Sequence, residues 1–178
     1  RRLEADCDII HGVKTRLQNT LRCIRENGVQ LDEVVVNSLA SAQAVLDQHQ
    51  KDLGAVAIDM GGGVTDYIVY ENGAVRHSGV LAVGGDHISN DISLGLRIPL
   101  TRAEKLKVEE GSTVLGQGTP GEMIVLKNDA GFSGKEVERE MLNTIIHARV
   151  REMFELIRKG IESEIPLHLL GAGVVGRT

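Results

Sequence analysis

The sequence predicts an α/β fold in which a mixed sheet is flanked by helices and carries a small inserted α+β lobe. Three observations lead to this fold class. Apolar runs typical of buried strands lie on both sides of the glycine triplet at 61–63. Asn-Gly at 72–73 supplies the positive φ angles of a two-residue hairpin turn. Apolar residues recur at helical spacing in 13–27, 39–46, 88–96 and 137–161.

Length and composition limit the classes of function. The 178 residues are enough for one domain or two small lobes with a real core. A net charge of −5 argues against nucleic-acid binding, and 2% aromatic residues without tryptophan argue against a base-stacking platform. Cys7 and Cys23 lie far apart and form no C-x-x-C motif, so we expect reduced thiols rather than a disulfide or metal site.

The first fifty residues predict two strands and two helices. Residues 3–10 alternate charged with apolar side chains, as a strand does, and residues 13–27 form an apolar stripe at helical spacing that Gly28 ends. Val34–Val36 is expected to be a short buried strand. Either Asn37 or Ser38 is then expected to cap a helix through Leu46.

The glycine triplet is the main candidate for a binding site. It follows Asp59 at the end of one predicted strand and leads into the next, so it forms a tight loop between strands. Glycines without Cβ atoms let backbone N–H groups surround a phosphate, and Asp59 could hold a hydrated Mg²⁺ beside it. A glycine-rich hairpin bend with a solvated aspartate remains the alternative. A P-loop motif is absent, and a dinucleotide motif would need glycine where Asp66 stands.

Gly84 and Gly85 open the next predicted helix. Unpaired N–H groups in its first turn would make a second anion cradle, although a plain helix-start turn fits equally well. Further on, Thr101 and Glu104 match a capping box, residues 109–119 read as a loop, and residues 123–126 read as a small strand.

The last part of the chain predicts one long helix and one strand. Ser133 and Glu136 match a second capping box, which would open an amphipathic helix that ends at Pro166. Leu167–Leu170 is expected to be a buried strand that leads into the glycine-rich residues 171–173.

The glycine loop resembles the second phosphate motif of the actin, Hsp70 and sugar-kinase superfamily. Its surroundings resemble, more narrowly, the FtsA family of bacterial cell-division proteins. The segments that carry this resemblance are 39–46, 59–66, 70–78, 83–92 and 103–111. It is strongest from Asn37 to Gly111 and weak in the long charged helix after Gly134.

The resemblance implies an actin-like ATPase half of the RNase H type. Residues 1–50 would end the first half and cross over, residues 51–95 and 134–178 would form the second half, and residues 96–133 would be the inserted smaller lobe. Because the chain starts at Arg1 rather than Met, we expect a fragment whose first phosphate motif lies upstream.

The resemblance also implies a set of site residues. A position at a helix start often carries the group that orients the attacking water; here it is Asn37, which is an alternative to its role as a helix cap. Asp59 would hold the metal ion through water. The residues expected to meet the nucleotide are Asp59, Gly61, Gly62, Gly63, Val64, Thr65, Gly84, Gly85, Glu104, Lys107, Gly171, Ala172 and Gly173.

Two of these positions depart from the superfamily pattern. Val64 stands where a threonine hydroxyl usually touches the γ-phosphate. Thr65 cannot simply replace that hydroxyl, because neighbouring residues on a strand face opposite sides. Ala172 replaces the second glycine of the expected adenosine motif.

As an FtsA-like protein, the full chain would bind ATP and Mg²⁺, polymerise head to tail and tether FtsZ filaments to the inner face of the membrane at the division site. The smaller lobe would dock the C-terminal tail of FtsZ, and a segment outside this chain would bind the membrane. We expect at most weak ATPase activity. The alternatives are an Hsp70-type or sugar-kinase-type enzyme and, because of Val64, a nucleotide-free scaffold.

Overall fold

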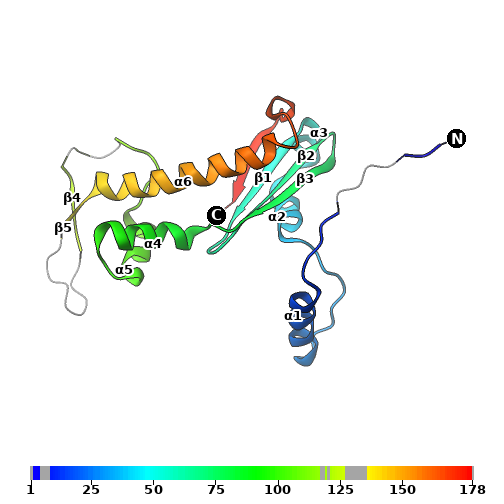
Figure 1. Ribbon diagram of the computed structural model, residues 1–178, viewed down its shortest axis with the longest axis horizontal. Coiled ribbons are helices and arrows are strands. Elements are labelled where there is room, and N and C mark those ends of the chain that lie inside the picture. Colours follow the sequence, from blue (N-terminus) through cyan, green and yellow to red (C-terminus); the bar gives the residue numbers. More distant parts are fainter. Residues whose placement is uncertain (1, 5–8, 117–118, 120, 127–135, 178) are drawn as a thin grey trace. The chain divides into compact units, whose positions relative to one another are not determined.

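The computed structural model describes residues 2–4, 9–116, 119, 121–126 and 136–177 (Figure 1). The chain separates into two compact units. We call Arg1–Asp59, Asp66–Gly79 and Glu164–Arg177 the sheet unit. We call Met60–Thr65 and Val80–Ser163 the helical unit. The division into two actin-like halves and a smaller lobe stays a prediction.

The sheet unit is built on four strands in the order β3–β2–β1–β6. They are β1 (Ala55–Met60), β2 (Thr65–Glu71), β3 (Ala74–Leu81) and β6 (Gly173–Arg177). Short loops join β1, β2 and β3, whereas β6 pairs in parallel with β1. The predicted mixed sheet is therefore confirmed. Asn72 and Gly73 have φ angles of 53° and 76°, as the predicted hairpin turn requires.

The helices immediately before β1 are α2 (Asn37–Val45) and α3 (Gln48–Leu53), and α3 has a capping box between Asp47 and Gln50. Apolar side chains of α2 and the strands form one buried cluster because each element presents its apolar face to the other. Its buried members are Ala42, Leu46, Ala55, Ala57, Ile68 and Tyr70.

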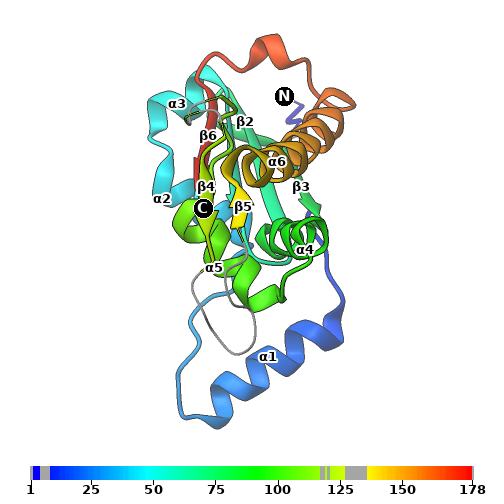
Figure 2. The ribbon, with the colours of Figure 1, turned by 90° about the vertical axis from the view of Figure 1, so that its left-hand side faces the viewer.

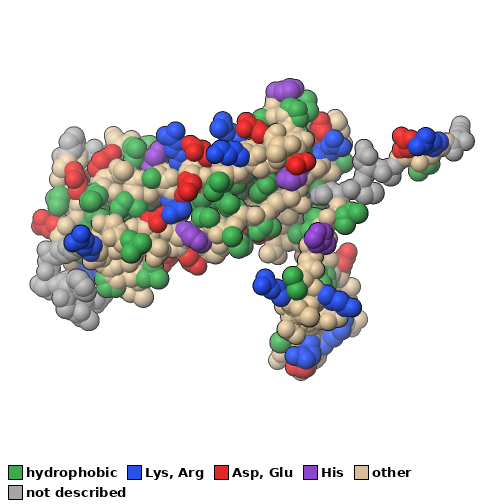
Figure 3. Space-filling view, viewed as in Figure 1, with side chains coloured by type: hydrophobic (Ala, Val, Ile, Leu, Met, Phe, Trp, Pro, Cys, Tyr) green, Lys and Arg blue, Asp and Glu red, His purple; other side chains and the backbone are tan. Residues whose placement is uncertain are grey.

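The predicted first helix exists as α1 (Lys14–Glu26), and Gly28 follows it with a φ angle of 72°. None of its residues is buried, and lysine and arginine side chains stand on its surface (Figure 3). Of the strand expected at 3–10, residues 5–8 lie outside the described residues, and the described flanks are not in a strand.

Two predictions around residue 36 are wrong. Val34, Val35 and Val36 form no strand and are 51%, 48% and 38% exposed. A strand needs a neighbour for its backbone hydrogen bonds, and none of the described strands pairs with this segment. Neither Asn37 nor Ser38 is a cap, because Val36 holds the N-cap position of α2 and no side chain caps it.

The helical unit contains α4 (Gly85–Leu96), α5 (Leu100–Glu110) and α6 (Arg139–Glu162), with α4 in contact with both others (Figure 2). Its small sheet pairs β4 (Met123–Val125) with β5 (Glu136–Glu138) in antiparallel register. The buried cluster comprises Ile92, Leu96, Ile98, Ala103, Leu106, Ile124, Leu126, Val137, Leu142 and Ile146. No helix in the described part of the chain is long and apolar enough to span a bilayer.

Arginine side chains on α6 tie the helical unit together. Arg139 donates to the Glu110 carboxylate at 2.7 Å and to Glu122 at 2.8 Å. Arg149 holds both carboxylate oxygens of Asp91 on α4, at 2.6 and 3.0 Å. Such bidentate, charge-assisted bonds fix the helix positions more firmly than a single-point contact would.

The capping box predicted at Thr101 does not form, and the one predicted at Ser133 lies outside the described residues. Pro99 is the N-cap of α5, so Thr101 lies inside the helix and makes no capping bond. Ser133 lies outside the described residues, and Glu136 belongs to β5, so α6 begins only at Arg139. The buried pair Ile124–Val137 across β4 and β5 explains why a strand forms here.

The end of the chain also differs from prediction. Helix α6 ends at Glu162, before Pro166, and Leu167–Leu169 form a short 3₁₀ helix, η1, instead of a buried strand. Leu167 and Leu169 are 36% and 40% exposed. The strand forms later, over Gly173–Arg177, where β1 offers a partner.

Candidate functional site

The glycine loop lies between β1 and β2, and its ends are closed by a bond from the Gly61 N–H to the Val64 carbonyl at 2.9 Å. All three glycines are exposed. Among the described residues, no hydrogen bond occupies the N–H of Gly62 or Gly63. Exposed backbone N–H groups in a bend are suited to bind an anion such as a phosphate.

Helix α4 begins directly against this loop. The N–H groups of Gly85 and Asp86 donate to the carbonyls of Gly61 and Gly62 at 2.9 and 2.8 Å. The N–H of Gly84 donates to Nδ1 of His87 at 3.2 Å. The expectation of unpaired amides in this first turn is therefore wrong, because the loop carbonyls already satisfy them. The helix start holds the loop in place, and nucleotide binding by Gly84 and Gly85 stays a prediction.

Gly84 is required by space rather than by a special φ angle. A Cβ atom there would lie 2.4 Å from both loop carbonyl oxygens, Gly61 O and Gly62 O. Gly63 is the opposite case, because a Cβ there would meet nothing within 4 Å. Alanine at position 84 should therefore disturb folding, whereas alanine at position 63 should leave the fold intact and test ligand binding alone.

Val64 and Thr65 face different surroundings, as the strand geometry predicts. The Val64 side chain is 43% exposed beside the loop. Thr65 is fully buried, and its hydroxyl donates to the Val83 carbonyl at 2.8 Å. Because the Thr65 hydroxyl is already hydrogen-bonded inside the helical unit, it does not replace the hydroxyl missing at position 64.

Glu104 and Lys107 on α5 meet Ser89 on α4. The Lys107 Nζ donates to a Glu104 carboxylate oxygen at 2.7 Å, to the Ser89 hydroxyl at 2.9 Å and to the Gly85 carbonyl at 3.1 Å. The Ser89 hydroxyl also bonds the Glu104 carboxylate. Hydrogen bonds from Lys107 and then Ser89 lower the pKa of Glu104. Both predicted ligands thus belong to one network that touches the start of α4.

In the sheet unit, Asp59 is the penultimate residue of β1, and its carboxylate accepts a hydrogen bond from the Ser41 hydroxyl on α2. Asn37, one helical turn before Ser41, is exposed. Burial, and secondarily the charge of Asp59, raises the pKa of Asp66. A carboxyl with a raised pKa next to a second carboxylate is a candidate proton acceptor or cation ligand.

The carboxylate oxygens of Asp59 are suited to hold a cation. One Asp59 oxygen accepts from Ser41, and the described residues bring no hydrogen bond to the other. Those residues include no group of three or more His, Cys, Asp or Glu side chains placed to hold a metal ion. A Mg²⁺ ion here would therefore keep most of its water ligands, as it usually does beside phosphates.

The structure gives Gly171, Ala172 and Gly173 a place that prediction missed. Gly171 and Ala172 precede β6, and Gly173 is its first residue, in register with Ala55 at the start of β1. The Gly171 N–H donates to the Leu53 carbonyl oxygen at 2.9 Å. A Cβ atom on Gly171 would also lie 2.9 Å from that oxygen, which is too close for a side chain. The expected order of strand then glycines is wrong, and the nucleotide role of these residues stays a prediction.

Sequence reasoning missed Ser41, Asp66 and Ser89 as members of the site. Asp66 was visible only as the second aspartate of the loop motif. Ser41 and Ser89 lie 18 and 15 residues from the carboxylates they contact. One weak signal existed, because Ser41 follows Asn37, and Ser89 follows Gly85, by four residues on a helix.

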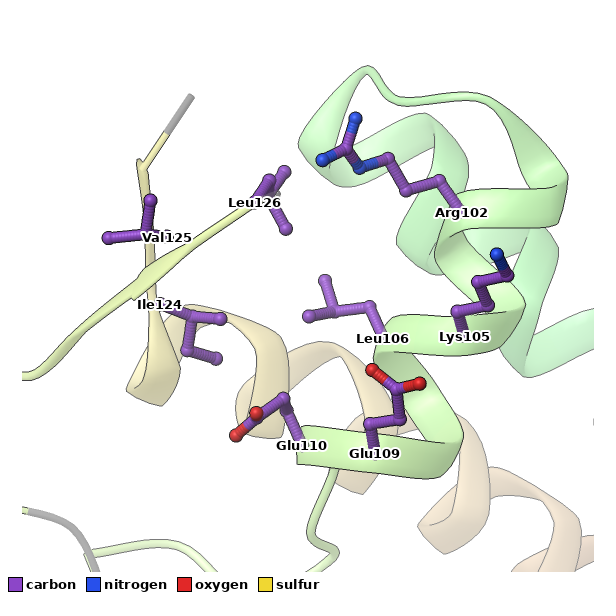
Figure 4. Close-up of a pocket in the computed structure, with 8 residues that line it drawn as sticks. All are labelled: Arg102, Lys105, Leu106, Glu109, Glu110, Ile124, Val125 and Leu126. Atoms are coloured by element: carbon purple, nitrogen blue, oxygen red, sulfur yellow. The ribbon is translucent and has the colours of Figure 1, made fainter. Parts of the chain in front are cut away.

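A separate cavity of about 230 Å³ lies in the helical unit between α5 and β4 (Figure 4). Leu106 of α5, Ile124 of β4 and Leu126, which directly follows β4, supply its apolar lining. Charged side chains of α5 also line it, namely Arg102, Lys105, Glu109 and Glu110. The cavity therefore combines an apolar lining with charged side chains of α5.

Comparisons with known proteins agree on one family. The family model described as "Cell division protein FtsA" matches residues 56–174. The cell division proteins FtsA of Neisseria meningitidis serogroup B and Pseudomonas aeruginosa are 39% and 32% identical over 175 and 174 residues. Both alignments cover 98% of this chain but 42% of the relative, so the chain spans about two fifths of the length of these relatives.

Solved structures agree on the fold. The crystal structure of Spiroplasma citri MreB5 bound to ADP has a TM-score of 0.73 at 22% identity, covering 93% of this chain and 54% of the other. Its complex with AMPPNP has a TM-score of 0.70 at 23% identity with the same coverage. At this identity the likeness shows the actin-like fold alone, as the sequence predicted.

Proposed function

Because the chain belongs to the FtsA family of cell division proteins, we propose that it forms part of an actin-like protein that binds ATP with Mg²⁺ and polymerises head to tail. The whole protein would link FtsZ filaments to the cytoplasmic membrane at the inner face of the division site. A segment outside this chain would make the membrane contact. These roles rest on the family and on the geometry of the glycine loop.

The observation that carries the nucleotide proposal is the exposed loop at Gly61–Gly63. Its position is fixed by α4, while the N–H groups of Gly62 and Gly63 carry no hydrogen bond within the described structure. Asp59, one of whose carboxylate oxygens accepts a hydrogen bond from Ser41, would bind a hydrated Mg²⁺. Positively polarised N–H groups and a bound cation are the two features that retain a polyphosphate.

The cavity between α5 and β4 supports the FtsZ part of the proposal. Its apolar lining would take apolar side chains of a tail peptide, and Lys105 and Glu109, which also line it, would bind the peptide's charges. Exchanging Val125, which lines the cavity and is 60% exposed, for Asp should weaken binding of an FtsZ tail peptide, measured by fluorescence anisotropy. The same exchange at Val108, which is 71% exposed on α5 and does not line the cavity, is the matched control.

Gly63→Ala tests the nucleotide proposal. The added methyl has free space and Gly63 does not adopt a left-handed φ, so folding should be unaffected. If a phosphate contacts this loop, the methyl prevents its close approach and ATP affinity should fall about tenfold or more, since charge-assisted bonds contribute roughly 1.5–3 kcal/mol each. Calorimetry with ATP and Mg²⁺ in the whole protein measures this loss.

Gly12→Ala provides the control, because a Cβ there also meets nothing within 4 Å. It reproduces the effect of alanine on the unfolded chain without touching the loop. Equal ATP affinity in Gly63→Ala and Gly12→Ala would reject phosphate binding at this loop. It would favour the nucleotide-free scaffold.

A further inference from the structure

Ser89 lies between Glu104 and Lys107, two side chains that the family resemblance assigns to the nucleotide. It is 2% exposed and sits one helical turn after Gly85 on α4. Its hydroxyl bonds the Glu104 carboxylate, receives a hydrogen bond from Lys107 and lies 3.2 Å from the Gly85 carbonyl. A hydroxyl has a single hydrogen, which the charged carboxylate attracts more strongly than a carbonyl does. Ser89 is thus a donor to Glu104 and an acceptor from Lys107.

Lys107 has no spare donor in this arrangement. Its ammonium carries three hydrogens, and its three acceptors are Glu104, Ser89 and the Gly85 carbonyl. Its side chain is 19% exposed, whereas that of Glu104 is 48% exposed. The lysine is therefore fixed inside the network, and the glutamate is the member that faces solvent and can meet a ligand.

The same network reaches the glycine loop through one peptide unit. The Gly85 carbonyl accepts from Lys107, and the Gly85 N–H donates to the carbonyl of Gly61. Lys107 is consequently connected to the loop through main-chain atoms at the start of α4. The bonds from the Gly85 and Asp86 N–H groups to the loop carbonyls do not involve Lys107, so they remain when the lysine is displaced.

We propose that Ser89 is a positioning residue for the nucleoside end of the nucleotide, which holds Glu104 and Lys107 in one orientation against α4. The proposal rests on the proposed nucleotide site and adds a residue to it. Without the hydroxyl, Glu104 loses one donor and Lys107 one acceptor, and both long side chains regain rotamers. A nucleoside would then have to order them on binding, at a cost in affinity. A bare polyphosphate, bound by the glycine loop, would not have to order these side chains and would keep its affinity.

The test compares ATP with inorganic tripolyphosphate in the whole protein, with Mg²⁺, by calorimetry. Ser89→Ala should weaken ATP binding about tenfold and change tripolyphosphate affinity by less than about twofold, since only ATP has a nucleoside. Ser89→Thr, which keeps the hydroxyl, should restore ATP affinity. Ser89→Cys, of similar volume but a weak donor, should repeat the loss even if the alanine variant folds poorly.

Ser93→Ala is the matched control. Ser93 is one turn further along α4, and its hydroxyl donates to the Ile98 carbonyl at 2.7 Å, away from Glu104 and Lys107. It should leave both affinities unchanged. Equal losses for ATP and tripolyphosphate in Ser89→Ala, or the same ATP loss in Ser93→Ala, would overturn the proposal. A wild type that binds neither ligand would reject the nucleotide site itself, and this role with it.

Discussion

Gly84→Ala should destabilise the protein through the backbone contact between the loop and α4. The new Cβ would lie 2.4 Å from the carbonyl oxygens of Gly61 and Gly62, about 1 Å closer than ordinary contact allows. Those oxygens accept hydrogen bonds of 2.9 and 2.8 Å from Gly85 and Asp86. The loop cannot withdraw without stretching both bonds, which cost about 0.5–1.5 kcal/mol each, and overpacking adds about 1–3 kcal/mol.

The expected loss in the free energy of unfolding is therefore about 2–5 kcal/mol. Urea unfolding followed by circular dichroism measures it. Gly63→Ala serves as the control, because its methyl meets nothing within 4 Å and should change stability by less than about 0.5 kcal/mol. A loss below about 1 kcal/mol in Gly84→Ala, with an unchanged urea slope, would refute the claim that close approach requires this glycine.

Three further changes test the site. Burial and the Asp59 charge raise the pKa of Asp66 above its ordinary 3.8, so ionised Asp66 lowers the free energy of unfolding at neutral pH. Asp66→Asn should therefore raise the melting temperature at pH 7 but not below pH 3.8. Equal shifts in melting temperature at both pH values would contradict this. Val64→Thr should speed phosphate release up to about a hundredfold. A wild type that turns over at about 1 s⁻¹, with no faster release in Val64→Thr, would argue against it. Asp59→Ala should remove the Mg²⁺ dependence of ATP affinity measured by calorimetry, and unchanged dependence would make the loop a mere turn.

The parts of the fold that follow local rules could be predicted from the sequence. The turn at Asn72–Gly73 requires positive φ angles at both residues, and few dipeptides supply them. The glycine triplet between two apolar runs likewise marked β1 and β2 correctly. In both cases a short stretch of chain contains all the information that determines its structure.

Apolar runs without a defined partner misled the prediction. Val34–Val36 and Leu167–Leu170 have strand-like composition, but strand formation depends on a neighbour that composition does not reveal. The pairing of β6 with β1 placed the strand at Gly173–Arg177, so Gly173 lies in the strand, beside Ala55 at the start of β1. Site members such as Ser41 and Ser89 escaped prediction because their partners are distant in sequence.

The contact between the glycine loop and the start of α4 has a consequence for its evolution. It joins the carbonyls of Gly61 and Gly62 to the N–H groups of Gly85 and Asp86, and at Gly84 a side chain would collide with it. A contact made of main-chain atoms offers no pair of side chains that can mutate in compensation. We therefore expect no covariation between these positions in diverging sequences, only retention or loss of the glycine, so methods that infer contacts from correlated substitutions would overlook this one.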